Sequence, residues 1–387
     1  DTEAEHIPGC NMAFRKSILE SIGGFDERFR VAGDDVDVCW RLMANGHTIG
    51  FCAAAMVWHH RRNSVRTFWR QQKGYGRAEA LLEEKWPEKY NAAGHVSWCG
   101  RVYGPGALQL LTRPPRIYHG IWGSAPFQSA HHQAPPLFAA ISATPEWWLM
   151  VALLTIISSL SISWKPLLVF VPMLALALAL PVIQAWFGAS KSRFTTPIRG
   201  RLHAFRLRTL TAFLHVMQPI ARLYGRLQHG LTLWRWRGPR SWALPVPQKT
   251  AVFTRTWIEH QRRLELLEES LASLKTTTRR GGPFDSWDIE VRGGMFGSMR
   301  LLMAIEDQGS GTQYVRVLCQ PIFSIIGVAM MISFSCLALL ALQDGATKAA
   351  IVLGSFALLI GIRMIVDCGR SAAVARLAVQ QSGNCTA

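Results

Sequence analysis

Hydrophobic and polar positions divide the chain into parts with different patterns. Residues 1–104 mix short apolar runs with charged residues and glycines, which is typical of a soluble, mixed α/β region. Residues 105–144 are rich in Pro, Gly, His and Ser and predict an irregular connector. Two pairs of long apolar segments follow. A basic segment, 188–250, and a second polar unit, 251–320, separate the two pairs.

The pattern of the first part predicts three helices and one strand. Helices are predicted over Lys16–Ile22 and Asp35–Asn45, each followed by glycine, which readily adopts the left-handed conformation found after helices. The largely apolar run Thr48–Trp58 predicts a buried strand. The amphipathic stretch Val65–Lys85 predicts a long helix, interrupted at residues 74–76 by Gly-Tyr-Gly.

Each of the four apolar segments is near the ~20 residues that a helix needs to cross the hydrocarbon of a membrane. They are Pro145–Ile162, Leu167–Phe187, Pro321–Leu342 and Ala349–Val366. Short loops join the first two and the last two, which favours membrane hairpins over 145–187 and 321–366, followed by a tail over 367–387. The alternative, four buried helices of a soluble protein, remains open from the pattern alone.

The charge of the chain is positive and unevenly distributed. Its 42 Lys and Arg against 25 Asp and Glu give a net charge of +17, and the stretch from Gly188 to Thr250 has twelve Lys and Arg but no acid. Such a run can bind nucleic acid, but the flanking apolar segments favour an anionic membrane surface, and we expect no nucleic-acid partner. The positive-inside rule places this stretch in the cytosol, together with residues 1–144 if all four segments cross. This predicts a multi-pass protein of a bacterial-type inner (plasma) membrane.

The basic segment contains a predicted amphipathic helix within residues 202–235. Its apolar stripe recurs at three- and four-residue spacing: Leu207, Leu210, Leu214, Met217, Ala221, Tyr224, Leu227 and Leu231. Most of its arginines lie away from that stripe, and Pro219 should kink the helix. A helix lying in the headgroup plane fits this pattern, and so does a helix packed on the protein's own core.

The polar unit 251–320 predicts a small α+β domain. A helix over Trp257–Leu274 precedes three strand-like runs, which are Trp287–Val291, Arg300–Ile305 and Gln313–Leu318. Asp285, Asp288 and Glu290 could suggest a metal site, but we expect solvated strand faces. The eight cysteines of the chain include no Cys-x-x-Cys pair and predict scattered reduced thiols.

The acidic run Gly33-Asp34-Asp35-Val36-Asp37-Val38-Cys39-Trp40-Arg41 has the most specific chemistry. It follows Pro8-Gly9-Cys10-Asn11-Met12-Ala13-Phe14-Arg15 and Ile22-Gly23-Gly24-Phe25-Asp26-Glu27. In this order the motifs resemble the acceptor half of a family 2 glycosyltransferase of the GT-A fold, over about residues 6–104. That family carries Gly-Glu-Asp-x-Asp-Leu-x-x-Arg, so Asp34 replaces its Glu. The resemblance implies a partial GT-A domain whose nucleotide-binding half, with its Asp-x-Asp motif, should precede residue 1.

The activity that the resemblance implies is transfer of a sugar from a nucleotide sugar to a lipid-linked or glycan acceptor, with inversion. It places the general base on Asp35 and acceptor contacts on Asp34 and Asn11. Without the flanking motifs, either carboxylate of the Asp-Asp pair could be an ordinary helix N-cap. A non-catalytic membrane scaffold and a component of polysaccharide export are the alternative functions.

The resemblance also implies a divalent cation, Mg²⁺ or Mn²⁺, held mostly by the nucleotide-binding half. A histidine from this half can join it, and His59 or His60 stands at the right place after the apolar run. Arg61 and Arg62 follow and could bind a diphosphate, or they could form a basic face near lipid.

A further acceptor contact is implied for Gln71, Gln72 and Tyr75. Processive synthases of the family carry Gln-(Gln/Arg)-x-x-Trp, and here Tyr75 replaces the Trp. An aromatic face can stack on a sugar ring while amides bind its hydroxyls. The alternative for these residues is a polar helix surface.

Overall fold

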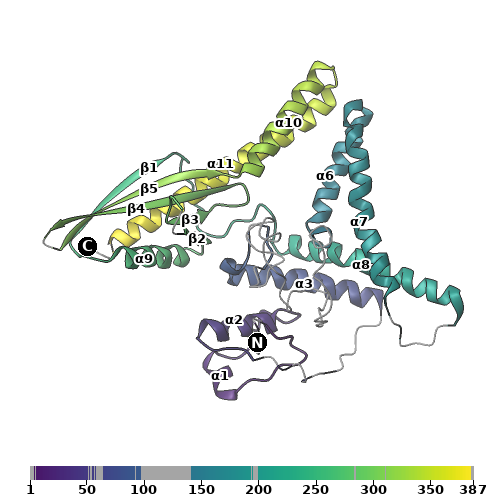
Figure 1. Cartoon of the computed structure of the whole chain (residues 1–387), viewed down its shortest axis with the longest axis horizontal. Coiled ribbons are helices and arrows are strands. Elements are labelled where there is room, and N and C mark those ends of the chain that lie inside the picture. Colours follow the sequence, from purple (N-terminus) through teal and green to yellow (C-terminus); the bar gives the residue numbers. More distant parts are fainter. Residues whose placement is uncertain are drawn as a thin grey trace. The chain divides into compact units, whose positions relative to one another are not determined.

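The computed structural model describes residues 4, 6–50, 52, 55, 57, 64–91, 93–96, 141–192, 194, 199–282, 285–309 and 311–384. The chain forms two compact units (Figure 1). Unit 1 is Asp1–Ser161 with Lys165–Thr232, and unit 2 is Ile162–Trp164 with Leu233–Ala387. The predicted fold class, an α/β region with helical hairpins and a small α+β domain, is confirmed in this mixed architecture.

Unit 1 begins with the helices that the sequence pattern predicts. They are α1 (Lys16–Ser21), α2 (Asp34–Ala44) and α3 (Val65–Lys85), followed by a short 3₁₀ helix, η1 (Pro87–Lys89). Glycines with positive φ follow α1 and α2, at 78° for Gly23 and 79° for Gly46. The region 97–140, with most of the predicted connector, lies outside the described residues. Six of the eleven residues of the predicted buried strand Thr48–Trp58 are described; they form no strand, and only Ile49 among them is buried.

The predicted interruption of α3 is wrong, because the helix is continuous through its Gly-Tyr-Gly sequence. A Cβ atom on Gly76 would lie 2.2 Å from the carbonyl oxygen of Arg222, in α8 (Gly200–Gln228). Gly225 of α8 makes the matching approach to the carbonyl oxygen of Lys73, also at 2.2 Å. The glycine in α3 therefore permits close helix packing and does not break the helix, at a cost of about 1 kcal/mol in helix propensity.

The first apolar pair of unit 1 forms two packed helices, α6 (Trp147–Ser159) and α7 (Phe170–Ser190). The indole N–H of Trp147 donates to the carbonyl of Ala177 at 2.9 Å and joins them near one end. The 3₁₀ turns η2 (Leu160–Ile162) and η3 (Lys165–Val169) lie at the connection.

Three helices of the described chain are long and apolar enough to cross a membrane: Lys165–Ser190, Ile325–Gln343 and Thr347–Gln381. The apolar helix Trp147–Ile162 is shorter. Only 17%, 17% and 28% of the residues in the three apolar windows are buried inside the protein. This exposure argues against the alternative in which the apolar segments are core helices of a soluble protein.

Unit 2 contains a five-stranded antiparallel sheet in the order β1-β5-β4-β3-β2. The strands are β1 (Gln248–Thr254), β2 (Thr278–Arg280), β3 (Ile289–Arg292), β4 (Gly297–Gly309) and β5 (Thr312–Phe323). The sequence predicts only β3, β4 and β5. Strand β2 has three residues and no apolar alternation, while β1 lies across the predicted boundary at residue 250 between the basic segment and the α+β domain.

The helices of unit 2 pack on the sheet or leave it. They are α9 (His260–Ser273), α10 (Ile325–Gln343) and α11 (Thr347–Asn384). Leu264, Leu267 and Leu271 of α9 share a core with Val374 and Ala378 of α11. Figure 1 shows α11 running from α10 to the sheet as one helix. The helix thus continues through the predicted division at residue 366, and its later part, with Val374 and Ala378, packs in the sheet core. The division between hairpin and tail stays a prediction.

Candidate functional site

The two acidic residues at the start of α2 occupy its first turn. The N-cap is Gly33, with φ 88°, which has no side chain that could cap the helix. Asp34 and Asp35 therefore follow the cap, and the alternative in which either of them is the N-cap is wrong. Their negative charges still favour this position, because the N-terminus of a helix carries a partial positive charge.

The Asp35 carboxylate is held by groups from two segments. Its Oδ2 accepts the backbone N–H of Gly9 at 3.0 Å, its Oδ1 accepts that of Val36 at 2.9 Å, and Nε2 of His6 lies 3.4 Å from Oδ2. Burial raises the pKa of Asp35, but His6 and the two N–H groups lower it more, so it lies below the usual 3.8. The carboxylate is thus ionised at neutral pH and fixed in orientation.

Asp34 has a different environment from its neighbour. Its side chain is half-buried, and none of the described residues makes a hydrogen bond or ion pair with its carboxylate. A carboxylate without protein partners at a helix N-terminus can accept hydrogen bonds from a ligand. The two neighbouring carboxylates therefore differ. The protein holds that of Asp35 by hydrogen bonds, whereas that of Asp34 makes none with the described residues.

Asp37, the third acid of the run, is fully buried and structural. It lies 2.7 Å from Nζ of Lys85 and accepts the Nε–H of Arg41 at 2.8 Å and the indole N–H of Trp86 at 2.9 Å. Lys85 and Trp86 stand at the end of α3. Asp37 therefore joins α2 to α3.

The segment before α2 lies against the middle of α3. A Cβ on Gly33 would be 3.2 Å from the Cβ of Ala78, and a Cβ on Gly74 would be 2.7 Å from Cγ1 of Val31. These contacts bring the loop that presents Asp34 to the stretch of α3 that contains Tyr75. The acidic run and the glutamine-rich motif, separated by about forty residues in sequence, are neighbours in the fold.

The predicted acceptor residues on α3 fall into two environments. The side-chain amide of Gln71 donates to the hydroxyl of Tyr75 at 2.9 Å, so these two residues share one helix face. Gln72 is only 5% exposed, and its carbonyl oxygen has no hydrogen-bond partner among the described residues. Asn11 donates its amide to the carbonyl of Ala55, which ties the turn at Pro8 to the following segment.

The predicted metal and diphosphate residues, His59, His60, Arg61 and Arg62, lie outside the described residues. Within the described part of the chain, no group of three His, Cys, Asp or Glu side chains could hold a metal ion.

A buried ionic network, which sequence reasoning missed, connects α3 with α8. Glu79 of α3 pairs with Arg222 and Arg226 of α8, and all three side chains are at most 5% exposed. Arg226 also pairs with Glu146, the residue just before α6, and Glu146 lies 2.6 Å from Nε2 of His95. The sequence does show two arginines four positions apart, Arg222 and Arg226. It does not indicate their partner, because Glu79 lies over 140 residues earlier in the chain.

Burial raises the pKa values of both acids in this network, but their cationic partners lower them more. Arg222 and Arg226 hold the pKa of Glu79 below its usual range. Arg226 and His95 lower the pKa of Glu146 to about 2. Both carboxylates are therefore ionised at neutral pH, and the network fixes α8 on α3.

Residues 4–189 match the family described as Glycosyl transferase family group 2. A 112-residue stretch is 29% identical to the Pre-mycofactocin glycosyltransferase of Mycobacterium tuberculosis, covering 28% of this chain and 24% of that protein. Another is 34% identical over 76 residues to the Probable glycosyltransferase YdaM of Bacillus subtilis, covering 20% and 18%. A third is 44% identical over 60 residues to the O-antigen biosynthesis protein RfbC of Myxococcus xanthus, covering 16% and 5%. No solved structure matches the chain.

These matches place Asp34 and Asp35 within a region that is similar to glycosyltransferases. The match of residues 4–189 to a family 2 model confirms the resemblance drawn from the sequence motifs. The matched stretches span about a quarter or less of the length of these curated relatives.

Proposed function

We propose that this chain carries the acceptor side of a membrane-bound, inverting, family 2 glycosyltransferase, with Asp35 as the general base. The observation that carries this proposal is the environment of Asp35. Its carboxylate is ionised, and the N–H groups of Gly9 and Val36 fix it at the start of α2. It lies within the segment that matches the family.

In the proposed reaction the acceptor hydroxyl oxygen attacks the anomeric carbon of a nucleotide sugar. The hydroxyl proton moves to the carboxylate of Asp35, while the bond from the anomeric carbon to the diphosphate oxygen breaks. The electron pair of that bond leaves with the nucleoside diphosphate. A divalent cation, when bound, supplies positive charge for this leaving group. We assign this chain's contribution to the cation to His60 or His59, and a diphosphate contact to Arg61 and Arg62.

The acceptor is proposed to lie between Asp34 and the face of α3 with Gln71 and Tyr75. Asp34 has no protein partner among the described residues, so it can accept hydrogen bonds from sugar hydroxyls. The Tyr75 ring offers a face for stacking, and its bond with Gln71 orients both side chains. Asn11 and Gln72 are proposed as further acceptor contacts. The amide of Asn11 donates to the carbonyl of Ala55, and Gln72 is 5% exposed, with a carbonyl oxygen that has no partner among the described residues.

The site is proposed to work at the cytosolic face of an inner membrane, where nucleotide sugars occur, on a lipid-linked or glycan acceptor. The three apolar helices and the acid-free basic segment support this location. Single cysteines in intact cells test the orientation with an impermeant maleimide. Cysteines replacing Lys165 or Lys348 should be labelled, and those replacing Arg199 or Lys249 should not. The reverse pattern would overturn the orientation.

The transfer itself is tested with the full-length protein in proteoliposomes that contain extracted membrane lipids as acceptor. Release of nucleoside diphosphate from UDP- and GDP-sugars is measured with Mg²⁺, with Mn²⁺ and with a chelator. We expect release that depends on acceptor, on cation and on Asp35. Release that continues unchanged with Asp35→Asn would reject the proposed base.

A further inference from the structure

Helix α8 has two parts with different surroundings. Its second part, from Pro219 onward, is docked on α3, with Arg222 and Arg226 buried beside Glu79. Part of the apolar stripe predicted from the sequence is covered within the protein, because Ala221 is fully buried and Leu214 and Met217 are half-buried, whereas Leu210 and Tyr224 of the same stripe are exposed. For these covered residues, the predicted alternative of a helix packed on the protein's own core is therefore the correct one.

The first part of α8, residues 200–217, carries a second apolar strip that the sequence analysis missed. It consists of Leu202, Phe205, Thr209 and Phe213, whose spacing of three and four residues places them on one helix face. The exposed fractions of the three apolar members are 70%, 56% and 51% in chain order. Large exposed apolar side chains that are aligned on one helix face indicate a surface that contacts a membrane or another molecule.

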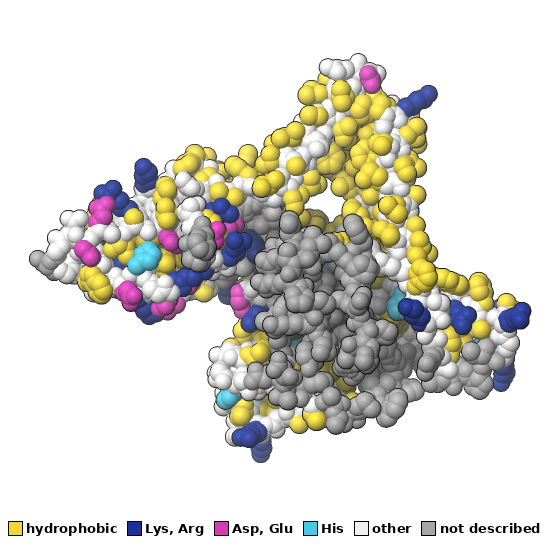
Figure 2. Space-filling model, viewed as in Figure 1, with side chains coloured by type: hydrophobic (Ala, Val, Ile, Leu, Met, Phe, Trp, Pro, Cys, Tyr) yellow, Lys and Arg dark blue, Asp and Glu magenta, His cyan; other side chains and the backbone are white. Residues whose placement is uncertain are grey.

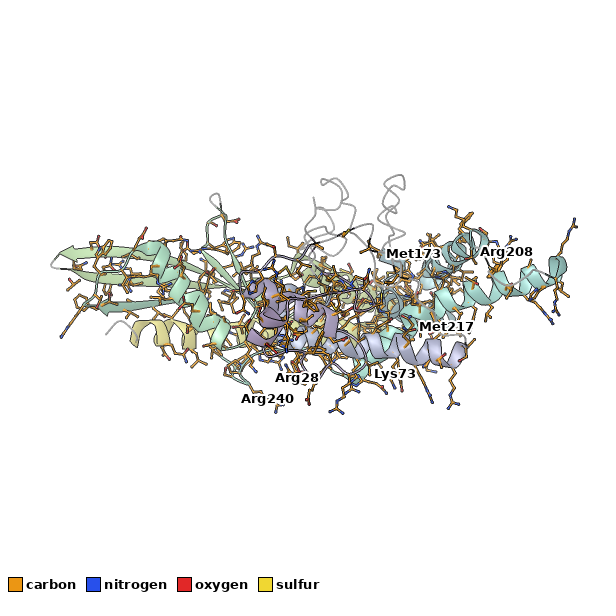
Figure 3. The ribbon with its side chains drawn as sticks, turned by 90° about the horizontal axis from the view of Figure 1, so that it is seen from below. Arg28, Lys73, Met173, Arg208, Met217 and Arg240 are labelled. Atoms are coloured by element: carbon orange, nitrogen blue, oxygen red, sulfur yellow. The ribbon has the colours of Figure 1, made fainter. Side chains whose placement is uncertain are left out.

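Three arginines border this strip. At 100° per residue, Arg206 lies on one side of it, and Arg201 and Arg208 lie on the other. All three are exposed, and none has an ion-pair partner among the described residues. Figure 2 shows Lys and Arg side chains gathered over this end of α8, and Figure 3 places Arg208 towards the N-terminal end and Met217 nearer the middle.

The exposed strip is continuous with the surface of α7. The rings of Trp186 and Phe205 lie 6.0 Å apart between centroids, and Trp186 and Phe187 at the end of α7 are themselves 41% and 62% exposed. In the space-filling view, hydrophobic surface runs along α7 and onto this part of α8 (Figure 2). Whatever apolar medium covers the end of α7 therefore also reaches α8.

We propose that residues 200–217 of α8 form a binding site for anionic phospholipid at the membrane surface. The exposed strip enters the acyl boundary next to α7, and Arg201, Arg206 and Arg208 bind phosphate groups on either side of it. Because the stretch from Gly188 to Thr250 contains no Asp or Glu, none of its own side chains repels these lipids. Because the second part of α8 is fixed on α3, lipid binding would hold the α3 face at a set distance from the membrane. This site does not depend on the chemistry at Asp35.

The test uses the whole chain in lipid nanodiscs, with its exposed cysteines replaced by Ser. Nitroxide labels are placed singly at Leu202→Cys and Phe213→Cys, on the exposed strip. Gln228→Cys, at the docked end of the same helix, is the matched control. Accessibility of each label to oxygen and to a water-soluble nickel chelate is measured in phosphatidylcholine alone and in its mixture with phosphatidylglycerol. We expect the labels at 202 and 213 to become accessible to oxygen and protected from nickel when phosphatidylglycerol is present, with no change at 228.

The arginines are tested by Arg206→Gln with Arg208→Gln. This pair should weaken the effect of phosphatidylglycerol by up to about 30-fold in the docking equilibrium. The control pair, Lys249→Gln with Arg255→Gln, removes the same charge from exposed positions in and just after β1 of unit 2 and should leave the effect intact. Strip labels that stay open to nickel in both lipids would overturn the proposal, and so would labels shielded from both reagents, as a covering protein would produce. Equal docking in both lipids would reject the anionic headgroup.

Discussion

Lys85, the last residue of α3, places its ammonium group 2.7 Å from the carboxylate of Asp37 on α2. Asp37 lies two residues after Asp35, so the contact fixes the helix that presents the proposed base. The same lysine pairs with Asp26 at 2.8 Å, in the loop between α1 and α2. One cation therefore connects the motif around Asp26, the acidic run and α3.

The first prediction is that Asp37→Asn destabilises unit 1. The substitution removes a fully buried charge and leaves Arg41 and Lys85 without their shared partner. Breaking a buried ion pair from one side typically costs about 3–5 kcal/mol. Thermal or denaturant unfolding of the purified protein measures the loss. Glu306→Asn, at an exposed strand pair with Arg316, is the control and should change stability little. Equal effects of the two substitutions would show that the Asp37 contacts contribute no more than surface pairs.

The second prediction concerns the contact between α3 and α8. Gly76→Ala would place a methyl group 2.2 Å from the carbonyl oxygen of Arg222, so the helices must separate, at a cost of about 1–3 kcal/mol. Gly188→Ala, within α7, is the matched control, because its methyl group would lie 3.7 Å from His215 at ordinary contact distance. Melting temperatures of both variants check the difference. A Gly76→Ala variant as stable as Gly188→Ala would mean that the helices do not pack as closely as the structure shows.

The third prediction is loss of this docking in acid. The folded-state pKa of Glu146 is lowered from its usual 4.5 to about 2, and that of Glu79 is also lowered. A lowered folded pKa gives stability that is fully present above the unfolded value and is lost as pH falls through the folded value. Stability should therefore be flat near neutral pH and decline below about pH 4.5. Unfolding curves measured against pH test this, and Glu146→Gln should remove part of the decline. A decline that begins near neutral pH would point to other groups.

The sequence predicts elements well where one residue type decides the outcome locally. Helices α1 and α2 end where glycines follow them, and the acidic run begins α2, because these choices need only the neighbouring residues. Asp35 and Asp37 show the limit of that reasoning. Both are aspartates two positions apart, yet Asp37 is structural because Lys85 comes from 48 positions further along the chain.

Elements whose partners lie far away in sequence could not be predicted in the same way. From the sequence alone, Gly76 predicts an interruption of the helix, because the sequence does not show that α8 packs closely against it. In α8 both apolar stripes have helical spacing, and the sequence alone does not show that Ala221 is buried while Leu202 is 70% exposed. The sequence also does not show where the membrane-length part of α11 ends, because membrane hydrocarbon and the core of the sheet both favour apolar side chains.

The last prediction is that Asp35→Asn abolishes transfer by the full-length enzyme while leaving it folded. Asn keeps the shape of Asp and one acceptor oxygen, but its amide group faces the N–H of Gly9 or Val36, so stability should fall by about 1 kcal/mol. Because the amide cannot take the acceptor's proton, turnover should fall by about 10²–10⁴-fold. Asp34→Asn is the matched control. We expect it to weaken acceptor binding and raise KM more than it lowers kcat, because we assign it no proton transfer.

The pH dependence of turnover separates this role from a purely structural one. A base must be deprotonated, so its activity rises with pH through its pKa, and that of Asp35 lies below the usual 3.8. The wild-type enzyme should therefore show no acid limb from Asp35 above that value. His6→Gln removes the imidazole beside Oδ2, so it should move this limb upward while the enzyme keeps most of its turnover. Rates measured across pH, with melting temperatures as the folding control, decide the matter. If Asp35→Asn keeps more than about a tenth of the activity, Asp35 only orders the start of α2 and the base lies elsewhere.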